Sequence, residues 1–418
     1  MARILALDTH PVRHRAALYQ QLGGTYGHDV TVLYGADANT KHFAPGETEH
    51  RFEWELSLLG GYKAHFGERI RRGDQLNIDR LHCKKLGRTV LRTRPELILW
   101  SDLHSRFALE AATWLWPLSI PWVLRLERLG FGPEPMPWVG NLREALRRRI
   151  YRRAESIAYV GERARQHFTE FGVPKSKQVF SPFGIVTAGL RTEESDRAAL
   201  RGLQRTAWQV PDSHRVLLYL GSPTTERDAQ SVVEAVRSLH PRLRDQTRVV
   251  FPDTEPLRSA IQERALRQPV VAVNFCQLAE PANDSTLWPS AAYHGADMAV
   301  LPCSDHAIGW GSALNGALAH GLPCLASDRV GGSADLIVTG ITGHLFEADS
   351  ATALAEAVAR MWSYTGAPGL RSRCRDHAGR YSLGEAGAGL NRAIKSALSY
   401  TSSQASSAVC EMPNGPQS

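Results

Sequence analysis

Short apolar runs alternate with longer amphipathic stretches along most of the chain. Unbroken runs of four or five apolar residues occur at 4–7, 97–100, 216–220 and 298–301. Strands of a parallel sheet, which is buried on both faces, show runs of this kind. Between the runs, stretches such as 351–362 repeat apolar residues at helical spacing. The alternation predicts an α/β fold built on parallel sheets.

The stretch 295–346 shows this pattern most clearly. An apolar run ends in a proline, a loop with Gly309 and Gly311 follows, and Ser312 is placed to cap a helix. The free N–H groups and the dipole at such a helix start form a site for a diphosphate. Gly311 is then expected to leave room for the phosphate. An ordinary sheet crossover, with glycines only for turns, is the alternative.

Composition narrows the classes of protein that fit. The chain has 418 residues, enough for two domains, and its 49 basic against 42 acidic residues leave a net charge of +7. That excess favours anionic ligands or acidic lipid surfaces. No basic run is interleaved with aromatic residues, so a nucleic-acid partner is not expected.

Two further features bear on the location of the protein. The six cysteines are scattered without the spacing of a metal site, which favours a reducing cytosol. No signal peptide precedes the first strand, and the longest apolar stretch, 113–126, contains two prolines and is too short to span a membrane. We therefore expect a cytoplasmic protein.

The stretch 295–346 also resembles a known protein family. Its segments GADMAVLP, WGSALNGALAHGLP, ASDRVGG and GITGHLF are similar to the donor-binding signature of the family 4 (group 1) glycosyltransferases. In the first half, RPELILW, IPWVLRLER and the segment YRRAESIAYVGERARQHFTEFGVPKSKQVFSPFGI also resemble that family. The resemblance extends over residues 4–398 and implies the GT-B fold, two facing Rossmann-like domains with parallel sheets.

The resemblance implies a division of the chain. Residues 1–188 would form an acceptor-side domain and residues 189–382 a nucleotide-sugar-binding domain. A helix over 383–400 would cross back to the first domain. Residues 401–418 are polar, and we expect a disordered tail. Residues 37–75 show no clean periodicity, so no element is predicted there.

The donor site follows from the family pattern. The family carries a basic residue just after the glycine that corresponds to Gly221, and a lysine five positions later, both on the donor diphosphate. Ser222 and Arg227 take these positions here. The resemblance assigns further diphosphate contacts to Gly309, Trp310, Gly311, Ser312 and Asn315. It places the nucleoside base beside Gln277 and Leu278.

One part of the family pattern is missing. The family has a glutamate, seven residues and a second glutamate, which support the donor sugar and fix the ribose. The second glutamate falls on Gly316, and the first falls on Ile308 or, with a two-residue slip, on His306. His306 is then the polar side chain beside the donor phosphates, where it can hydrogen-bond the donor and serve as a candidate catalytic group.

Loops at the carboxyl ends of the first sheet supply the acceptor side, because ligands bind there in such sheets. Candidate acceptor-binding residues are His10, Arg13, His14 and His104. Glu127 follows the strand 122–124, where its carboxylate can accept a proton from a hydroxyl or bind that hydroxyl. Solvated polar loops, and an ion pair of Glu127 with Arg125 or Arg128, are the alternatives.

These features predict a glycosyltransferase that moves a sugar from a nucleotide diphosphate sugar to a hydroxyl acceptor, retaining by resemblance. The acceptor can be a glycan, a lipid-linked sugar or a metabolite. We expect no metal and no cofactor beyond the nucleotide sugar co-substrate. An inactive GT-B protein that binds a nucleotide or sugar as a partner subunit, and a nucleotide-sugar epimerase, are the alternatives. The basic helix 141–153 can lie on an anionic membrane, although packing on the sheet is the commoner role of such a helix.

Overall fold

The computed structural model describes residues 1–37, 58–68, 77, 80–127, 137–187, 190–222, 225–255, 257–267, 271–277, 288–304 and 309–410. The chain forms two compact units. Unit 1 comprises Met1–Gly184 and Leu383–Ser418, and unit 2 comprises Ile185–Ser382.

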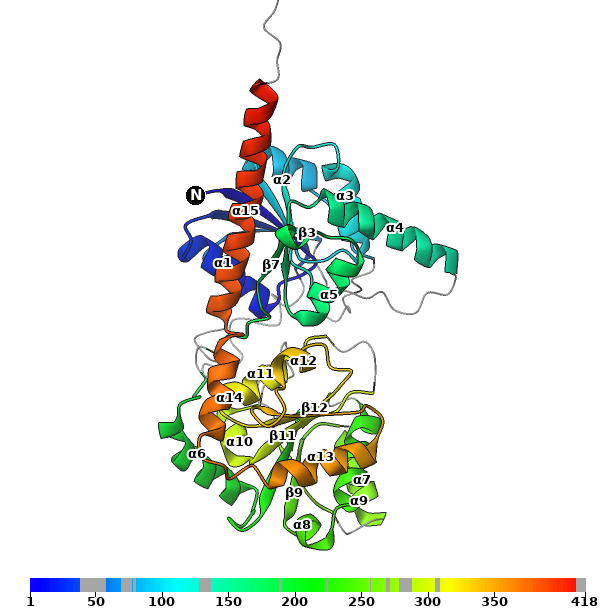
Figure 1. Ribbon diagram of the computed structural model, residues 1–418, viewed down its shortest axis with the longest axis vertical. Coiled ribbons are helices and arrows are strands. Elements are labelled where there is room, and N and C mark those ends of the chain that lie inside the picture. The colour runs from blue at the N-terminus through cyan, green and yellow to red at the C-terminus, as the bar shows by residue number, and fades with distance from the viewer. Residues whose placement is uncertain are drawn as a thin grey trace, which may run out of the picture. The chain divides into compact units, whose positions relative to one another are not determined.

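Unit 1 is built on a parallel sheet of seven strands in the order β3-β2-β1-β4-β5-β6-β7. Figure 1 shows this sheet with helices packed around it. The strands are β1 Arg3–Asp8, β2 Asp29–Ala36, β3 Lys63–Glu68, β4 Leu97–Trp100, β5 Trp122–Leu124, β6 Ser156–Tyr159 and β7 Gln178–Phe180. The order reverses between β1 and β4, which is the ligand-binding switch point of a doubly wound sheet.

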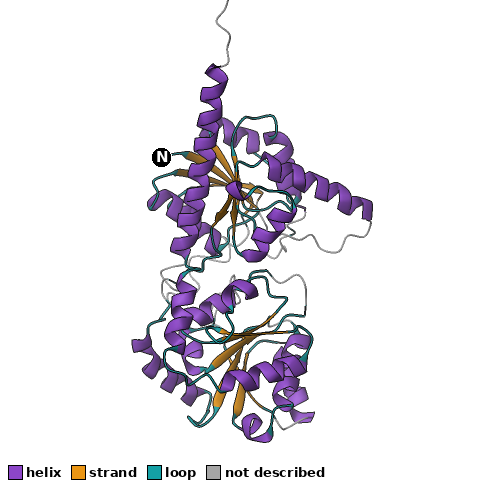
Figure 2. Cartoon of the chain, viewed as in Figure 1, coloured by secondary structure: helices purple, strands orange, loops and turns teal. Residues whose placement is uncertain are grey.

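Helices cover both faces of this sheet (Figure 2). They are α1 Arg13–Gly24, α2 Leu86–Thr93, α3 Arg106–Leu115, α4 Pro137–Arg153, α5 Glu162–Glu170 and α15 Leu383–Cys410, with a 3₁₀ turn at Lys175–Lys177. The C-terminal helix α15 packs against α1 and the strands β5 to β7. Leu390 and Ile394 of α15 share a core with Ile4 and Val123, so the end of the chain completes the first unit.

Unit 2 repeats the design with six parallel strands in the order β10-β9-β8-β11-β12-β13. The strands are β8 Arg215–Tyr219, β9 Thr247–Pro252, β10 Ala272–Cys276, β11 Met298–Leu301, β12 Cys324–Ser327 and β13 Gly343–Phe346. Here the order reverses between β8 and β11.

The helices of unit 2 are α6 Glu194–Ala207, α7 Glu226–Arg237, α8 Pro241–Asp245, α9 Leu257–Arg267, α10 Ser290–Gly295, α11 Ser312–Ala319, α12 Ser333–Leu336, α13 Ala351–Trp362 and α14 Leu370–Gly379. Side chains of α7, α9 and α13 form one core with the strands, centred on Tyr219, Phe251 and Trp362. This packing fixes the starts of α7 and α13 at the carboxyl edge of the sheet.

The structure differs from the sequence-based expectation at two elements. Strand β3, Lys63–Glu68, was not predicted, because this edge strand is only partly buried and lacks an apolar alternation. Helix α15 continues to Cys410, where the sequence led us to expect a disordered tail from residue 401. Extending a formed helix adds one hydrogen bond per residue without a new nucleus, which offsets the polar composition. No helix within the described residues is long and apolar enough to cross a membrane.

Candidate functional site

The carboxyl edge of the first sheet gathers polar side chains around Glu127, just after β5. Nε2 of His14, in the first turn of α1, lies 2.8 Å from Oε2 of Glu127. Arg125 donates to Oε1 of Glu127 and also, through its Nη2, to the carbonyl of Pro182 at 3.0 Å. The His14 ring packs on Phe183, with the ring centroids 4.6 Å apart. These contacts fix both the imidazole and the carboxylate.

The charge of Glu127 is set by these neighbours. Burial by itself would raise the pKa of the carboxyl group, but His14, Arg125 and Arg15 hold it well below its usual value. Glu127 is therefore a stable carboxylate and a weak base. The ion pair with Arg125, which the sequence left open as an alternative, is formed, while Arg128 lies outside the described residues.

A second buried carboxylate lies at the end of β1. Asp8 is fully buried, pairs with Nη1 of Arg15 at 3.0 Å and accepts a hydrogen bond from the hydroxyl of Tyr19 at 3.0 Å. The Tyr19 hydroxyl also contacts Oγ of Ser101, after β4, at 2.7 Å. Burial raises the pKa of Asp8 to about 6, against the opposing effects of Arg15 and Tyr19. This network joins the two strands at the switch point.

The remaining acceptor-side candidates lie around the same edge. His10 follows β1, its Nδ1 lies 3.0 Å from Oγ1 of Thr9, and burial lowers the pKa of its imidazole to about 4. Arg13 is the first residue of α1. His104 follows β4, and its backbone N–H donates to Oδ1 of Asp102 at 3.0 Å. His10 is thus a neutral hydrogen-bonding group at neutral pH.

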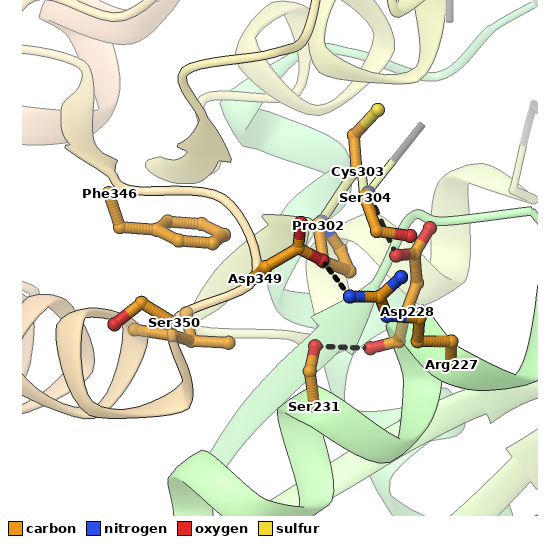
Figure 3. A pocket seen from close by; sticks show the side chains of 10 residues that line it. Arg227, Asp228, Ser231, Pro302, Cys303, Ser304, Phe346, Asp349 and Ser350 are labelled. Atoms are coloured by element: carbon orange, nitrogen blue, oxygen red, sulfur yellow. Dashed lines mark hydrogen bonds and ion pairs between the residues drawn. The ribbon is translucent and has the colours of Figure 1, made fainter. Parts of the chain in front are cut away.

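In unit 2, a hollow of about 70 Å³ opens at the switch point between β8 and β11 (Figure 3). Arg227, in the first turn of α7, lines it and pairs with Oδ1 of Asp349 at 2.9 Å. The neighbouring Asp228 is buried, and its Oδ1 accepts the backbone N–H of Ser304 at 3.0 Å. Burial raises the pKa of Asp228. This bond attaches the loop after β11 to α7.

In the turn before α11, Gly311 is required by the packing of unit 2 itself. Gly311 has a φ of 83°, a left-handed conformation that favours glycine. A Cβ on this residue would lie 2.6 Å from Cγ1 of Val330 and 3.1 Å from Cδ2 of Leu301. The expectation that a side chain at Gly311 would fill the place of a phosphate is therefore wrong, because that side chain would meet the unit's own core.

The turn is held by its own side chains. Nε1 of Trp310 donates to Oδ1 of Asn315 at 2.6 Å, and Asn315 is almost fully buried. The backbone N–H groups of Gly331 and Gly332 donate to the carbonyls of Gly309 and Trp310 at 3.1 and 2.9 Å. Trp310 and Asn315 therefore shape the start of α11, where Ser312 is the first residue.

Of the other predicted donor residues, the structure describes Ser222 and Gln277. Ser222 follows β8, and its carbonyl accepts the hydroxyl of Tyr219 at 3.2 Å, whereas Gln277 lies exposed after β10. His306, Ile308 and Leu278 lie outside the described residues. Gly316, at the position of the second family glutamate, is buried within α11. Within the described part of the chain, no group of three His, Cys, Asp or Glu side chains is placed to hold a metal ion.

Two family models match the chain, one in unit 1 and one in unit 2. The model of a glycosyl transferase 4-like domain matches residues 12–184, and the model of glycosyl transferases group 1 matches residues 201–379. The chain belongs to the group 1 glycosyltransferases. No curated protein sequence matches this glycosyltransferase.

Solved structures share the fold of this glycosyltransferase. A glycosyltransferase from Rickettsia africae ESF-5 has a TM-score of 0.66 at 12% identity, over 94% of this chain and 98% of that chain. Anabaena Alr3699/HepE in complex with UDP has a TM-score of 0.65 at 17% identity, over 94% and 100%. The sucrose-phosphate synthase (tll1590) from Thermosynechococcus elongatus has a TM-score of 0.64 at 16% identity, over 94% and 98%. The predicted fold class, GT-B with two Rossmann-like domains, is confirmed.

Sequence reasoning missed four charged residues of these two edges. Asp8 and Arg15 were overlooked in unit 1, and Arg329 and Asp349 in unit 2. Asp8, Arg329 and Asp349 each follow or end a parallel strand, so the rule that ligands bind at carboxyl ends would have found them. Arg15 carries no such signal, because its position in α1 resembles that of any surface arginine.

Proposed function

We propose that this glycosyltransferase moves a sugar from a nucleoside diphosphate sugar to a hydroxyl group of an acceptor. The observation that carries the proposal is the hollow at the switch point of unit 2, which Arg227 lines in a chain of this family. A guanidinium at this edge of the sheet matches the charge and geometry of a phosphate. The Anabaena protein of the same fold, solved with UDP and with UDP-glucose, supports a donor of this class.

The diphosphate is the part of the donor that the arginine binds, and it is also the leaving group of the reaction. Negative charge develops on it as the bond to the sugar breaks, and fixed positive groups stabilise that charge. Arg227 and the N–H groups at the start of α11 supply such charge in unit 2. We propose that no metal takes part. Retention of the anomeric configuration is proposed on the resemblance alone, and NMR of the anomeric proton of the product tests it.

On the acceptor side, we propose that His14 binds the reacting hydroxyl. Its Nε2 is engaged by Glu127, so the orientation of the ring is set before the acceptor arrives. Glu127, as a carboxylate with a lowered pKa, positions His14. His10, a neutral imidazole in the same loop, is suited to hydrogen-bond further hydroxyls of the acceptor.

Contact with an anionic membrane stays a prediction for this protein. The side chain of Trp114, in α3, is 68% exposed, and the exposed Arg149 of α4 lies over the ring of Trp116 at 4.9 Å. Aromatic and arginine side chains together suit the interface of an acidic bilayer. Sedimentation with acidic and with neutral vesicles tests the contact, and equal sedimentation with both would contradict it.

The donor assignment is tested by calorimetric titration of Arg227→Ala with UDP, ADP and GDP. Loss of a charged phosphate contact should weaken binding of the diphosphate by about 1–2 kcal/mol, because Arg227 is largely solvent-exposed. The matching nucleoside should bind unchanged. Arg237→Gln, in the same helix and paired only at the surface with Glu234, is the matched control. Equal losses for nucleoside and diphosphate would refute the assignment.

A binding protein without catalysis is the second candidate function. The observation that favours it is the glycine at 316, where the family carries a glutamate that fixes the ribose. Such a protein would bind the nucleotide sugar and release no product. Assay of product release after binding has been measured separates the two functions.

A further inference from the structure

The charged side chains beside the donor hollow form a bridge between two arginines. Asp349, between β13 and α13, places Oδ1 at 2.9 Å from Nη2 of Arg227 and Oδ2 at 2.5 Å from Nη1 of Arg329. Nη1 of Arg329 also donates to the carbonyl of Ser304, after β11. One carboxylate thus holds guanidinium groups from two different strand ends, with one oxygen for each (Figure 3 shows the Arg227 half).

The two arginines come from different segments of unit 2, and Asp349, which lines the hollow, contacts both. Arg227 lies in the first turn of α7, after β8, and Arg329 follows β12, so both lie at the carboxyl edge of one sheet. Two guanidinium groups that share an anion with two oxygens have the arrangement that recognises a phosphate or diphosphate. Arg329 lies in the segment ASDRVGG, which resembles the family signature, but that resemblance assigns no donor contact to Arg329.

We propose that Arg329 is a second donor-diphosphate residue and that Asp349 takes the place of the anion while the site is free. The diphosphate displaces the carboxylate from the two guanidinium groups when it binds. This inference rests on the proposed function, because it concerns the same donor site. It adds a positioning residue, Asp349, whose carboxylate keeps both arginines at the hollow and competes with the donor.

The exposure of the three side chains makes the exchange feasible. The side chain of Arg227 is 72% exposed, and those of Arg329 and Asp349 are each 28% exposed. Ion pairs in contact with water are worth little, so a single carboxylate is readily displaced by a dianionic or trianionic ligand. Asp349 lies in the segment before α13 and adopts a φ of 59°, and its carboxylate contacts both arginines from this position. A left-handed backbone is tolerated by aspartate.

The test is calorimetric titration of the full chain with whichever of UDP, ADP and GDP binds best. Arg329→Gln should weaken binding of that nucleotide about tenfold, as for a charged phosphate contact. Asp349→Asn should tighten it about threefold or more, because the internal competitor is removed. Arg329→Lys, which keeps the charge and loses the fork, should fall between wild type and Arg329→Gln. Melting temperatures confirm that each variant is folded.

Matched controls separate this exchange from a general change of charge. Glu347→Gln removes the same charge two residues from Asp349, and Glu347 is paired with neither arginine among the described residues. Asp349→Asn must tighten binding more than Glu347→Gln does, and an equal effect overturns the role of Asp349. Unchanged affinity in Arg329→Gln, while Arg227→Ala weakens binding, overturns this inference alone. Failure of the wild type to bind any of the three nucleotides overturns the proposed function as well.

Discussion

At the scale of single residues, Glu127 is held as a carboxylate by His14, Arg125 and Arg15. We expect Glu127→Gln to lower turnover about 100-fold, because the imidazole loses the charge that orients it. Donor binding should be unchanged, since the donor residues belong to unit 2. Steady-state kinetics, with donor binding measured separately, checks both statements.

A matched pair in unit 1 provides the control for Glu127. Nδ1 of His82 lies 3.0 Å from Oε1 of Glu110, so Glu110→Gln also removes a carboxylate from a histidine. This variant should keep full turnover. Glu127→Gln leaves Arg125 with its contacts to Ser181 and Pro182, and its melting temperature should show a folded protein. Wild-type turnover in a folded Glu127→Gln variant would refute the role of this pair.

The sequence predicted the location of His14 and Glu127 but not the contact between them. The rule on carboxyl strand ends assigned His14 and Glu127, which lie 113 residues apart, to one edge of a sheet. It could not predict that the two side chains bond to each other, because that depends on the angle at which α1 leaves β1. Nor could it predict the lowered pKa of Glu127, which requires the positions of His14, Arg125 and Arg15 around it.

At the scale of elements, α15 packs closely on the first sheet at Gly389. A Cβ on this residue would lie 2.2 Å from the carbonyl oxygen of Phe180 and 2.7 Å from Cα of Ser181. Gly389→Ala should therefore destabilise the protein by about 1–3 kcal/mol, since backbone atoms of β7 must move. Chemical denaturation measures the change in the free energy of unfolding.

Gly87, in α2 of the same unit, is the control for Gly389. A Cβ there would meet nothing within 4 Å. Gly87→Ala should stabilise the protein by about 0.5–1 kcal/mol through helix propensity. If Gly389→Ala behaved like Gly87→Ala, the close packing of α15 on β7 would be wrong.

The end of α11 should make unit 2 sensitive to acid. His320 is buried, with Nδ1 2.7 Å from the carbonyl of Gly316 and Nε2 2.9 Å from Oγ of Ser290. Burial, together with the neighbouring His294 and Arg371, lowers the pKa of His320 from 6.5 to about 4, against the opposing effect of the hydrogen bond to Gly316. The folded protein therefore excludes a proton that the unfolded chain binds below pH 6.5.

Acid therefore lowers the free energy of unfolding. The neutral imidazole costs nothing above pH 6.5, and stability is lost as the pH falls from 6.5 towards 4, by up to about 2–3 kcal/mol. His320→Gln should flatten this part of the stability curve, whereas His240→Gln, at an exposed histidine, should leave it unchanged. Denaturation at pH 7 and pH 5 measures it. Equal slopes for wild type and His320→Gln would contradict the assignment.

Elements with unbroken apolar runs were predictable, and those that depend on packing were not. The runs 97–100 and 298–301 became β4 and β11 with the same bounds. The edge strand β3 was missed because its side chains are half-exposed. The role of Gly311 was misinterpreted, because a Cβ at this residue would meet Val330. Such a tertiary contact cannot be inferred from the periodicity of the sequence.

At the scale of the whole molecule, two units of the same design carry different chemistry. Unit 1 places an imidazole and carboxylates at its strand ends, and unit 2 places arginines and a glycine turn at its own. The fold class could be predicted because two sets of parallel strands and a long family signature agree. The same signature predicted the class of activity, which the family models support. The sequence left catalytic competence open, because Gly316 stands at the position of the second family glutamate and Ile308 or His306 at that of the first.

The most direct test is release of nucleoside diphosphate from UDP-, GDP- and ADP-sugars by the purified protein, with water or added sugars as acceptors. We predict release above the rate without enzyme for the nucleotide sugar that binds best. Release by Arg227→Ala should be slower, and release by Arg237→Gln should match wild type. Tight binding of a nucleotide sugar with no release of its nucleoside diphosphate, under any of these conditions, would contradict the proposed transferase and leave a binding protein.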